Sequence, residues 1–424
     1  MQTPASILRA ILVTSLPCVA LSQTPLTWQQ IKDKFEASNP TLRANQLNID
    51  ESRAAEITAY LRPNPSFTGT LDQLNPFAPG PSPTSPADGY RPFAFALPYA
   101  QFSYLHERDH KRELRLEGAK LQTDITASSA ADQERGLLFN LRSAFVNALQ
   151  AKAMLQNAKE NLDYWDHELG IFRDRLHAGD IAQIDYDRLD LQRVQFESDY
   201  ETDVVNLRTA KIQLLMLLND HTPIDSFDIS GPFDFLDRLG PLEQFHNVAL
   251  QSRPDLRAAV QSVELAESSH RLAVANGSTD PTFSIDFARN PPIPVYFGVS
   301  VTIPLRIFDR NQGEKARTAV DIRRNEKLRD AAQAQVFNDV DSAYVTIIGA
   351  VNLLKPYREK YLNLAKDTRD RVQFSYQNGG LSLLDYLDAE KAYRDVRLAY
   401  ISLIGSYLSA AAQMNMAAGR EVLE

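Results

Sequence analysis

The chain has 424 residues and a formal net charge of −9, and its charged residues, 23% of the total, are interspersed rather than clustered. A nucleic-acid-binding surface needs a clustered basic face, so this composition argues against such a partner. The single cysteine, Cys18, excludes an internal disulfide framework.

The first 22 residues are typical of a secretory signal peptide. The apolar stretch Ala10–Val19 follows a basic residue, and the small residues of Ala20-Leu21-Ser22 suit cleavage before Gln23. Cys18 falls inside this segment and could instead carry a lipid anchor. We therefore expect export, and a mature chain without a thiol if cleavage occurs before Gln23.

The mature chain is predicted to begin with a helix over Thr27–Leu61, followed by two strands at about 65–74 and 93–104. The return strand is interrupted by Pro98. The segment 73–91 between the strands is rich in Pro, Gly, Ser and Asn, which is typical of an exposed loop.

A long helical hairpin comes next. No proline occurs between Gln101 and Thr222, and helical apolar spacing continues over about 107–176. A helix of that length would measure about 105 Å at 1.5 Å per residue and would need a coiled-coil partner. The partner resumes after a break at 177–183, so the two helices are predicted to be antiparallel neighbours.

The second half of the chain repeats this plan. Leu26–Phe67 is similar to Leu242–Phe283, and the segment around Gly179 is similar to the one around Gly379. A repeat of roughly 200 residues is too long for a solenoid unit and indicates an internal duplication. The predicted domains are the signal peptide 1–22, the structural repeats 23–225 and 226–417, and a C-terminal tail 418–424.

Pro356 lies inside the second long rod and should kink it, because proline removes a backbone donor. The elements expected in the second repeat are a helix over Leu242–Ala275, strands at about 281–289 and 295–304, a rod over Asn311–Tyr376, and a return helix over Leu383–Ala417.

Four strands per chain are too few to close a barrel. Strands of this length cross a bilayer when tilted, but an open sheet in lipid leaves unpaired backbone groups that cost several kcal/mol each. If the strands are transmembrane, several chains must share one barrel. The alternative is a small soluble sheet beside a helical bundle, and the pattern leaves both open.

Four stretches resemble the outer-membrane efflux proteins typified by TolC, and most closely the branch that partners resistance-nodulation-division metal pumps. They are the opening helix Leu26–Pro65, the strand-to-rod junction Val299–Glu314, and the tips Gly179–Asp185 and Gly379–Asp388. The junction is the most specific of these motifs. Its first-half counterpart, Phe102–Arg108, lacks the usual glycine-rich form.

The resemblance covers nearly the whole chain and implies a mixed α+β membrane protein. Three chains would share a transmembrane β-barrel of twelve strands and a long antiparallel α-helical coiled-coil barrel of twelve helical layers. The sequence predicts four strands per chain and four helical layers: the two long rods, and two composite rods in which a return helix stacks end on end with a repeat helix. Both numbers agree with this count. The implied location is the outer membrane of a Gram-negative-type cell, with a long periplasmic extension.

The implied function is that of a passive exit duct in a tripartite efflux system. The partners would be a homotrimer of the chain, a periplasmic adaptor (membrane fusion) protein, an inner-membrane resistance-nodulation-division pump and outer-membrane lipid, with no nucleic acid. The cargo, metal ions or small organic compounds, stays open. Two other functions also stay open: the outer-membrane duct of a type I protein-secretion system, and a soluble periplasmic coiled-coil scaffold.

No catalytic constellation stands out in the sequence. We find no nucleophile–base pair, phosphate loop or paired-carboxylate cleft, so we do not expect an enzyme. No Met, Cys or His cluster lines a predicted path, and the sequence therefore indicates neither a metal site nor a cofactor.

Asp385 and Asp388 are the candidates for a channel constriction. They are three residues apart on one helix face, and threefold symmetry would place up to six carboxylates around one axis, where they select cations. By resemblance they match the acidic constriction of the family's closed periplasmic entrance. The competing interpretation of Asp385 is a helix cap, because Ser382 precedes it by three residues. The first-half equivalents are Asp185 and Arg188.

Small and apolar residues at both tips are candidates for docking the hairpin of an adaptor protein, and the alternative is simple packing within each turn. The glycines also suit the helix ends that they follow. The six residues are Gly179, Ile181, Ile184, Gly379, Leu381 and Leu384.

Overall fold

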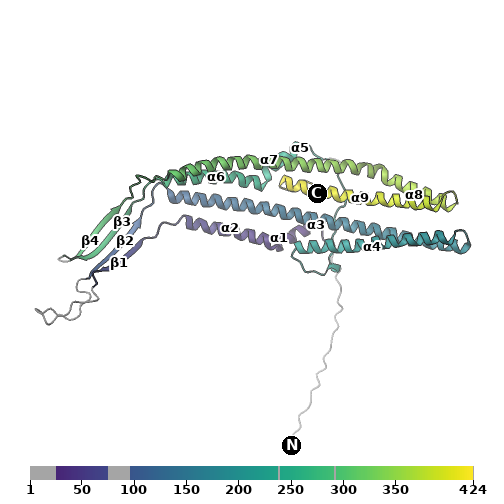
Figure 1. Cartoon of the computed structure of the whole chain (residues 1–424), viewed down its shortest axis with the longest axis horizontal. Coiled ribbons are helices and arrows are strands. Elements are labelled where there is room, and N and C mark those ends of the chain that lie inside the picture. The colour runs from purple at the N-terminus through teal and green to yellow at the C-terminus, as the bar shows by residue number, and fades with distance from the viewer. Residues whose placement is uncertain (1–24, 75–95, 237–238, 291–292, 424) are drawn as a thin grey trace, which may run out of the picture. The chain divides into compact units, whose positions relative to one another are not determined.

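The computed structural model describes residues 25–74, 96–236, 239–290 and 293–423. The expected signal peptide, with Cys18, and most of the expected loop at 73–91 lie outside these residues. Helices dominate and four strands form one sheet, so the predicted mixture of α and β structure is confirmed (Figure 1). The elements are α1 (Trp28–Ser38), α2 (Pro40–Ala59), β1 (Ser66–Asp72), β2 (Leu97–Leu105), α3 (Lys111–Ala178), α4 (Gln183–Leu217), η1 (Ile224–Ser226), α5 (Leu242–Ser252), α6 (Pro254–Ala275), β3 (Thr282–Asn290), β4 (Ile293–Thr302), α7 (Gln312–Pro356), η2 (Tyr357–Tyr361), α8 (Leu362–Gln377) and α9 (Leu383–Ala418).

The chain divides into two compact units. Unit 1 holds both hairpin tips, and unit 2 holds the whole sheet. Unit 1 comprises the chain up to Ser38, Ala144–Asp234 and Asp367–Gly405, and unit 2 comprises Asn39–Ser143, Phe235–Lys366 and the chain from Ser406 onward.

One order of elements occurs twice along the chain. Two helices, two strands and a helical hairpin run from α1 to α4, and the same series runs from α5 to α9. An internal duplication would produce this order. The duplication itself, and the domain boundaries drawn from it, stay predictions.

The two helices predicted as continuous over Thr27–Leu61 and Leu242–Ala275 are each broken once, which corrects the prediction. The breaks fall at Asn39 and Arg253, each of which precedes a proline and has extended backbone, with ψ of 120° and 118°. Proline disfavours the helical conformation in the residue before it. Asn39 also caps α2, because its side chain accepts hydrogen bonds from the next helical N–H groups.

The second long rod is interrupted after Pro356. A π-helical turn, η2, separates α7 from α8. Proline has no N–H to donate, and such a turn is a recognised way to absorb the disruption. The sequence predicted a kink at Pro356, and the structure has a π turn directly after this residue.

The sheet of unit 2 has one apolar and one polar face. Its strands are all antiparallel, in the order β1-β2-β3-β4. Because side chains alternate between faces, each row of paired residues lies on one face. One row is apolar and exposed, and its neighbour on the other face consists of serines. The apolar row is Phe67, Phe102, Ile285 and Val299, and the serine row is Ser66, Ser103, Ser284 and Ser300.

Pro98 does not interrupt the second strand, contrary to the sequence-based expectation. It lies within β2 and pairs with Leu71 of β1. The pairing between β2 and β3 covers only Tyr99–Leu105. Pro98, which has no N–H to donate, therefore lies just outside that ladder.

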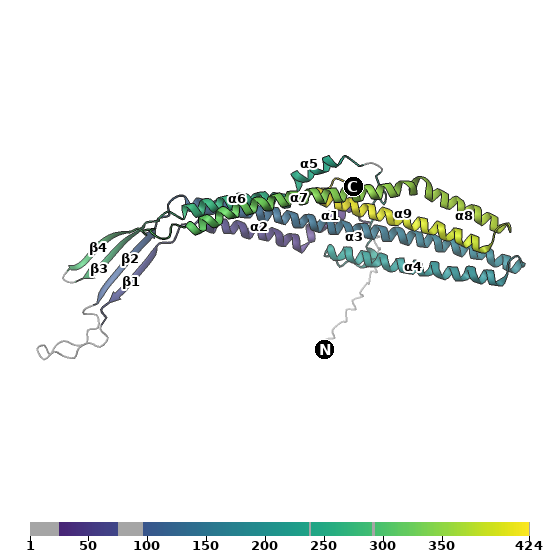
Figure 2. The same cartoon turned by 45° about the horizontal axis from the view of Figure 1, so that its top comes forward.

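In unit 2, contacts with α6 hold the start of α7, which follows the sheet in the chain. Both views show α6 alongside α7 (Figures 1 and 2). Asn311, which precedes α7 with a φ of 61°, donates its side-chain N–H to the carbonyl of Ala273 at 2.8 Å, and His270 contacts Thr318 at 2.8 Å.

Within the described residues, every helix is too short or too polar to be a membrane-spanning candidate.

Candidate functional site

Each hairpin tip in unit 1 is a glycine-terminated helix end. Gly179 and Gly379 have φ of 84° and 74°, a conformation that favours glycine. Gly179 donates its N–H to Leu176 at 3.0 Å and Asp180 donates to Arg175 at 2.9 Å, and the same pair of bonds closes α8. This paired geometry is the Schellman motif, so the tips reverse the chain through defined turns.

The second tip starts its return helix with a cap. Ser382 accepts the backbone N–H of Asp385 at 3.2 Å, and Asp385 accepts the backbone N–H of Ser382 at 3.0 Å and its hydroxyl at 2.6 Å. These hydrogen bonds from Ser382 lower the pKa of the Asp385 carboxyl. The cap interpretation of Asp385 is confirmed, and its carboxylate is held ionised at the tip.

The first tip lacks this cap. Ala182 has no side-chain oxygen to offer at the start of α4. Asp185 instead lies 3.8 Å from the Arg188 guanidinium, a loose ion pair. The two tips therefore differ in charge, since Asp388, the equivalent of Arg188, is an exposed carboxylate one turn beyond Asp385.

The predicted docking residues do not all lie on the surface. Ile184, Leu381 and Leu384 are 58%, 40% and 66% exposed. Ile181 is half-buried and packs against the core beneath the tips. In the single chain, Ile181 contributes to packing, whereas the other three side chains are available to a partner.

An aromatic core lies beneath the tips. Tyr386 of α9 stacks on Trp165 of α3 and on Tyr376 of α8, with ring centroids 6.2 and 5.4 Å apart. The indole N–H of Trp165 donates to the carbonyl of Leu189 in α4 at 3.0 Å. This core therefore joins the four helical segments that lead to the two tips.

A buried acidic group beside this core was not predicted. Glu390 of α9 is 8% exposed, lies 3.8 Å from Arg369 of α8, and accepts the hydroxyl of Tyr164 at 3.2 Å. Burial raises the pKa of Glu390 to about 7, against the opposing effect of Arg369. Glu390 shares a helix face with Leu383 and Tyr386, but helical spacing alone does not predict that an acidic residue on this face is buried.

Glu390→Gln is expected to flatten the pH dependence of stability. Because the pKa of Glu390 is raised in the fold, its favourable contribution is complete below about pH 4.5 and is lost as pH rises through 7. The difference amounts to about 3 kcal/mol. Thermal unfolding of the variant at pH 4 and pH 8 should show a gain over the native chain only at pH 8.

The matched control for this prediction is Glu201→Gln, which removes an exposed carboxylate from α4. It should leave the pH profile unchanged. A Glu390→Gln chain that loses stability equally at both pH values would mean that ionised Glu390 is stabilised by Arg369, contrary to the account above.

No group of three or more His, Cys, Asp or Glu side chains suited to hold a metal ion occurs among the described residues. The acidic residues at the tips therefore form no metal centre within the described part of a single chain. Any ring of carboxylates requires further copies.

Comparisons with known proteins point to transport. Residues 246–420 match the family model described as outer membrane efflux protein. The chain is 22% identical over 412 residues to the cobalt-zinc-cadmium resistance protein CzcC of Cupriavidus metallidurans, covering 93% of this chain and 90% of that protein.

Solved structures share the fold. A membrane protein from Pseudomonas aeruginosa superposes with a TM-score of 0.74 at 17% identity, over 92% of this chain and 90% of that one. The open state of the MtrE outer membrane channel of Neisseria gonorrhoeae superposes with a TM-score of 0.72 at 17% identity, over 93% and 89%.

Proposed function

We propose that this chain, a member of the outer membrane efflux protein family, is the outer-membrane exit duct of a tripartite efflux system. It conducts solutes passively, and an inner-membrane resistance-nodulation-division pump supplies the energy. Proteins of this family are transport ducts, so we propose that the chain is not an enzyme.

The observation that supports this proposal most strongly is the exposed apolar face of the sheet. Its apolar row is exposed across all four strands: Phe67 and Val299 are 74% and 68% exposed, and Phe102 and Ile285 lie between them. A soluble protein would cover such a face, because apolar surface is expelled from water. Lipid is the environment that suits it, while the serine row on the opposite face suits water.

Companion chains are needed to complete the wall. The outer edges of β1 and β4 pair with no other strand of the described chain. In lipid these backbone groups need partners, which further copies supply. Three chains would give a β-barrel of twelve strands and a separate helical barrel of twelve helical layers. An exposed apolar stripe on α4 also suits burial against a neighbour, and it consists of Leu191, Val194, Val205, Ile212 and Met216.

The tips are the proposed periplasmic entrance. A periplasmic adaptor protein would dock on the tip residues Gly179, Ile181, Ile184, Gly379, Leu381 and Leu384. Ile181 is half-buried, so its role would be to support the shape of the turn that the adaptor contacts. Asp385 and Asp388 of three chains would form the constriction. Opening requires a partner that binds the open arrangement more tightly than the closed one.

The cargo we propose is metal ions or small organic compounds. The name of the relative CzcC, a cobalt-zinc-cadmium resistance protein, favours divalent cations. Deleting the gene and measuring sensitivity to zinc, cobalt, copper and hydrophobic drugs separates the two classes. A secretion defect for a protein substrate would instead support a type I secretion duct.

The location and the pore are tested together by cell fractionation and planar bilayers. We expect the full chain in the outer-membrane fraction, and stepwise conductance after reconstitution of the detergent-extracted protein. Recovery in the soluble periplasm without conductance would support the scaffold function and overturn the duct.

Replacing both Asp385 and Asp388 by Asn should weaken block of single-channel current by divalent cations at least tenfold, because it removes the carboxylates that concentrate cations. Ser382→Ala is the control, since it removes the cap and keeps both carboxylates. Unchanged block in the double variant would remove these residues from the constriction.

A further inference from the structure

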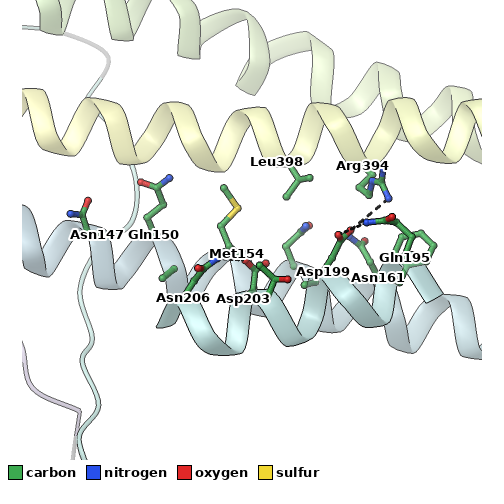
Figure 3. Close-up of a pocket in the computed structure, with 15 residues that line it drawn as sticks. Asn147, Gln150, Met154, Asn161, Gln195, Asp199, Asp203, Asn206, Arg394 and Leu398 are labelled. Carbon is green, nitrogen blue, oxygen red and sulfur yellow. Dashed lines mark hydrogen bonds and ion pairs between the residues drawn. The ribbon is translucent and has the colours of Figure 1, made fainter. Parts of the chain in front are cut away.

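Unit 1 contains a groove that the duct function does not use. It has a volume of about 560 Å³ and lies between α3, α4 and α9 (Figure 3). Arg394 and Leu398 of α9 face the side chains of α3 and α4 across it. The lining residues that carry polar side chains are Asn147, Gln150, Asn157, Asn161, Gln195, Asp199, Thr202, Asp203, Asn206 and Arg394.

The lining is polar where a coiled-coil seam is usually apolar. On α3, the four carboxamides at 147, 150, 157 and 161 recur at helical spacing, and on α4 the polar residues at 195, 199, 203 and 206 do the same. Apolar residues at such positions would have closed the helices together. The sequence therefore maintains a hydrogen-bonding groove along two rods.

Two lining side chains have buried polar atoms without a hydrogen-bond partner: Asn157, and Arg394, whose Nε lies 3.8 Å from the carboxylate of Asp395. Asn157 is 2% exposed, and neither its amide nitrogen nor its oxygen has a hydrogen-bond partner. A buried carboxamide without partners is unfavourable, so unsatisfied groups of this kind call for an explanation such as a bound molecule. Asn157 can donate to a ligand and accept from it.

The charge in the groove is unbalanced. Asp199 lies 3.7 Å from the Arg394 guanidinium and accepts the Gln195 amide at 2.7 Å (Figure 3). Asp203 accepts only the amide of Asn206, at 3.2 Å, and no described cation pairs with it. Two carboxylates face one guanidinium, so a cationic ligand would balance the groove. Burial raises the pKa of Asp203, as expected for a carboxylate without a cation.

The groove is long as well as polar. Its lining on α3 runs from Asn147 to Asn161, which spans about 21 Å at 1.5 Å per residue. A metal ion would need ligands converging on one point, and no such group occurs in the described residues. We propose that the groove binds an elongated organic cation of the polyamine class, with its ammonium groups on Asp203 and Asp199 and on the carboxamide oxygens.

The test is calorimetric titration of spermine into the full chain in detergent. We expect saturable binding, at least tenfold weaker binding for Asp203→Asn and for Asn157→Leu, and no change for Glu201→Gln, which removes an exposed carboxylate of the same helix outside the groove. Thermal unfolding checks that each variant is folded. Asn157→Leu should not destabilise the chain, because it removes an unpaired polar group.

Three outcomes would overturn this proposal. They are titration without saturation, equal loss of binding in Glu201→Gln, and displacement of spermine by millimolar Mg²⁺ at constant ionic strength, which would assign the groove to metal ions. None of them bears on conductance, so the duct function is tested separately.

Discussion

Val299→Arg should abolish assembly in the outer membrane. Val299 lies on the apolar face near the middle of β4, and an arginine on the lipid face costs about 2–4 kcal/mol in each chain near the bilayer midplane. Three copies would carry this cost together. The measurement is the amount of heat-modifiable oligomer in isolated outer membranes, which we expect to fall at least tenfold.

The control is Ser300→Arg, the same substitution one residue further along β4 and therefore on the opposite face. A side chain on that face would meet water, so assembly should be retained. Equal loss in both variants would mean that the two faces are not distinguished by lipid, and the orientation proposed for the sheet would be wrong.

Trp165→Ala should destabilise unit 1 by about 3–5 kcal/mol, the cost of truncating a buried aromatic side chain. Trp165 is 1% exposed, stacks on Tyr386, and donates to the carbonyl of Leu189. The substitution would open a cavity and remove the indole hydrogen bond to that carbonyl. Equilibrium unfolding in urea, followed by helical circular dichroism, measures the loss.

Trp165→Phe is the matched variant, because it keeps most of the buried ring and removes the hydrogen bond. It should cost about 1 kcal/mol, the usual net value of one hydrogen bond. If Trp165→Ala changed stability by less than 0.5 kcal/mol, the aromatic core would not hold the tip segments together.

Features with a local cause could be predicted from the sequence. Alternation predicted a strand at about 281–289, where the structure has β3, and the spacing of Ser382 and Asp385 predicted the cap that the structure contains. The two corrected helices also had a local cause, the prolines after Asn39 and Arg253, whose effect was underestimated. Pro98 was overestimated, because its consequence depends on where the neighbouring ladder ends.

Features with a tertiary cause could not be predicted. Glu390 is polar by composition, and only the packing of α3, α8 and α9 around it makes it a buried acid. The unpaired Asn157 belongs to the same class, since a carboxamide in a long helix is ordinarily solvated. Burial of these groups depends on which helices meet, and helical periodicity alone does not specify that.

The central claim is that one sheet of four strands forms one third of a shared wall. Native mass spectrometry of the full chain, extracted from outer membranes in detergent, tests it most directly. The account predicts a complex of three chains that separates into single chains only on unfolding. A folded single chain as the sole species under the same conditions would contradict it.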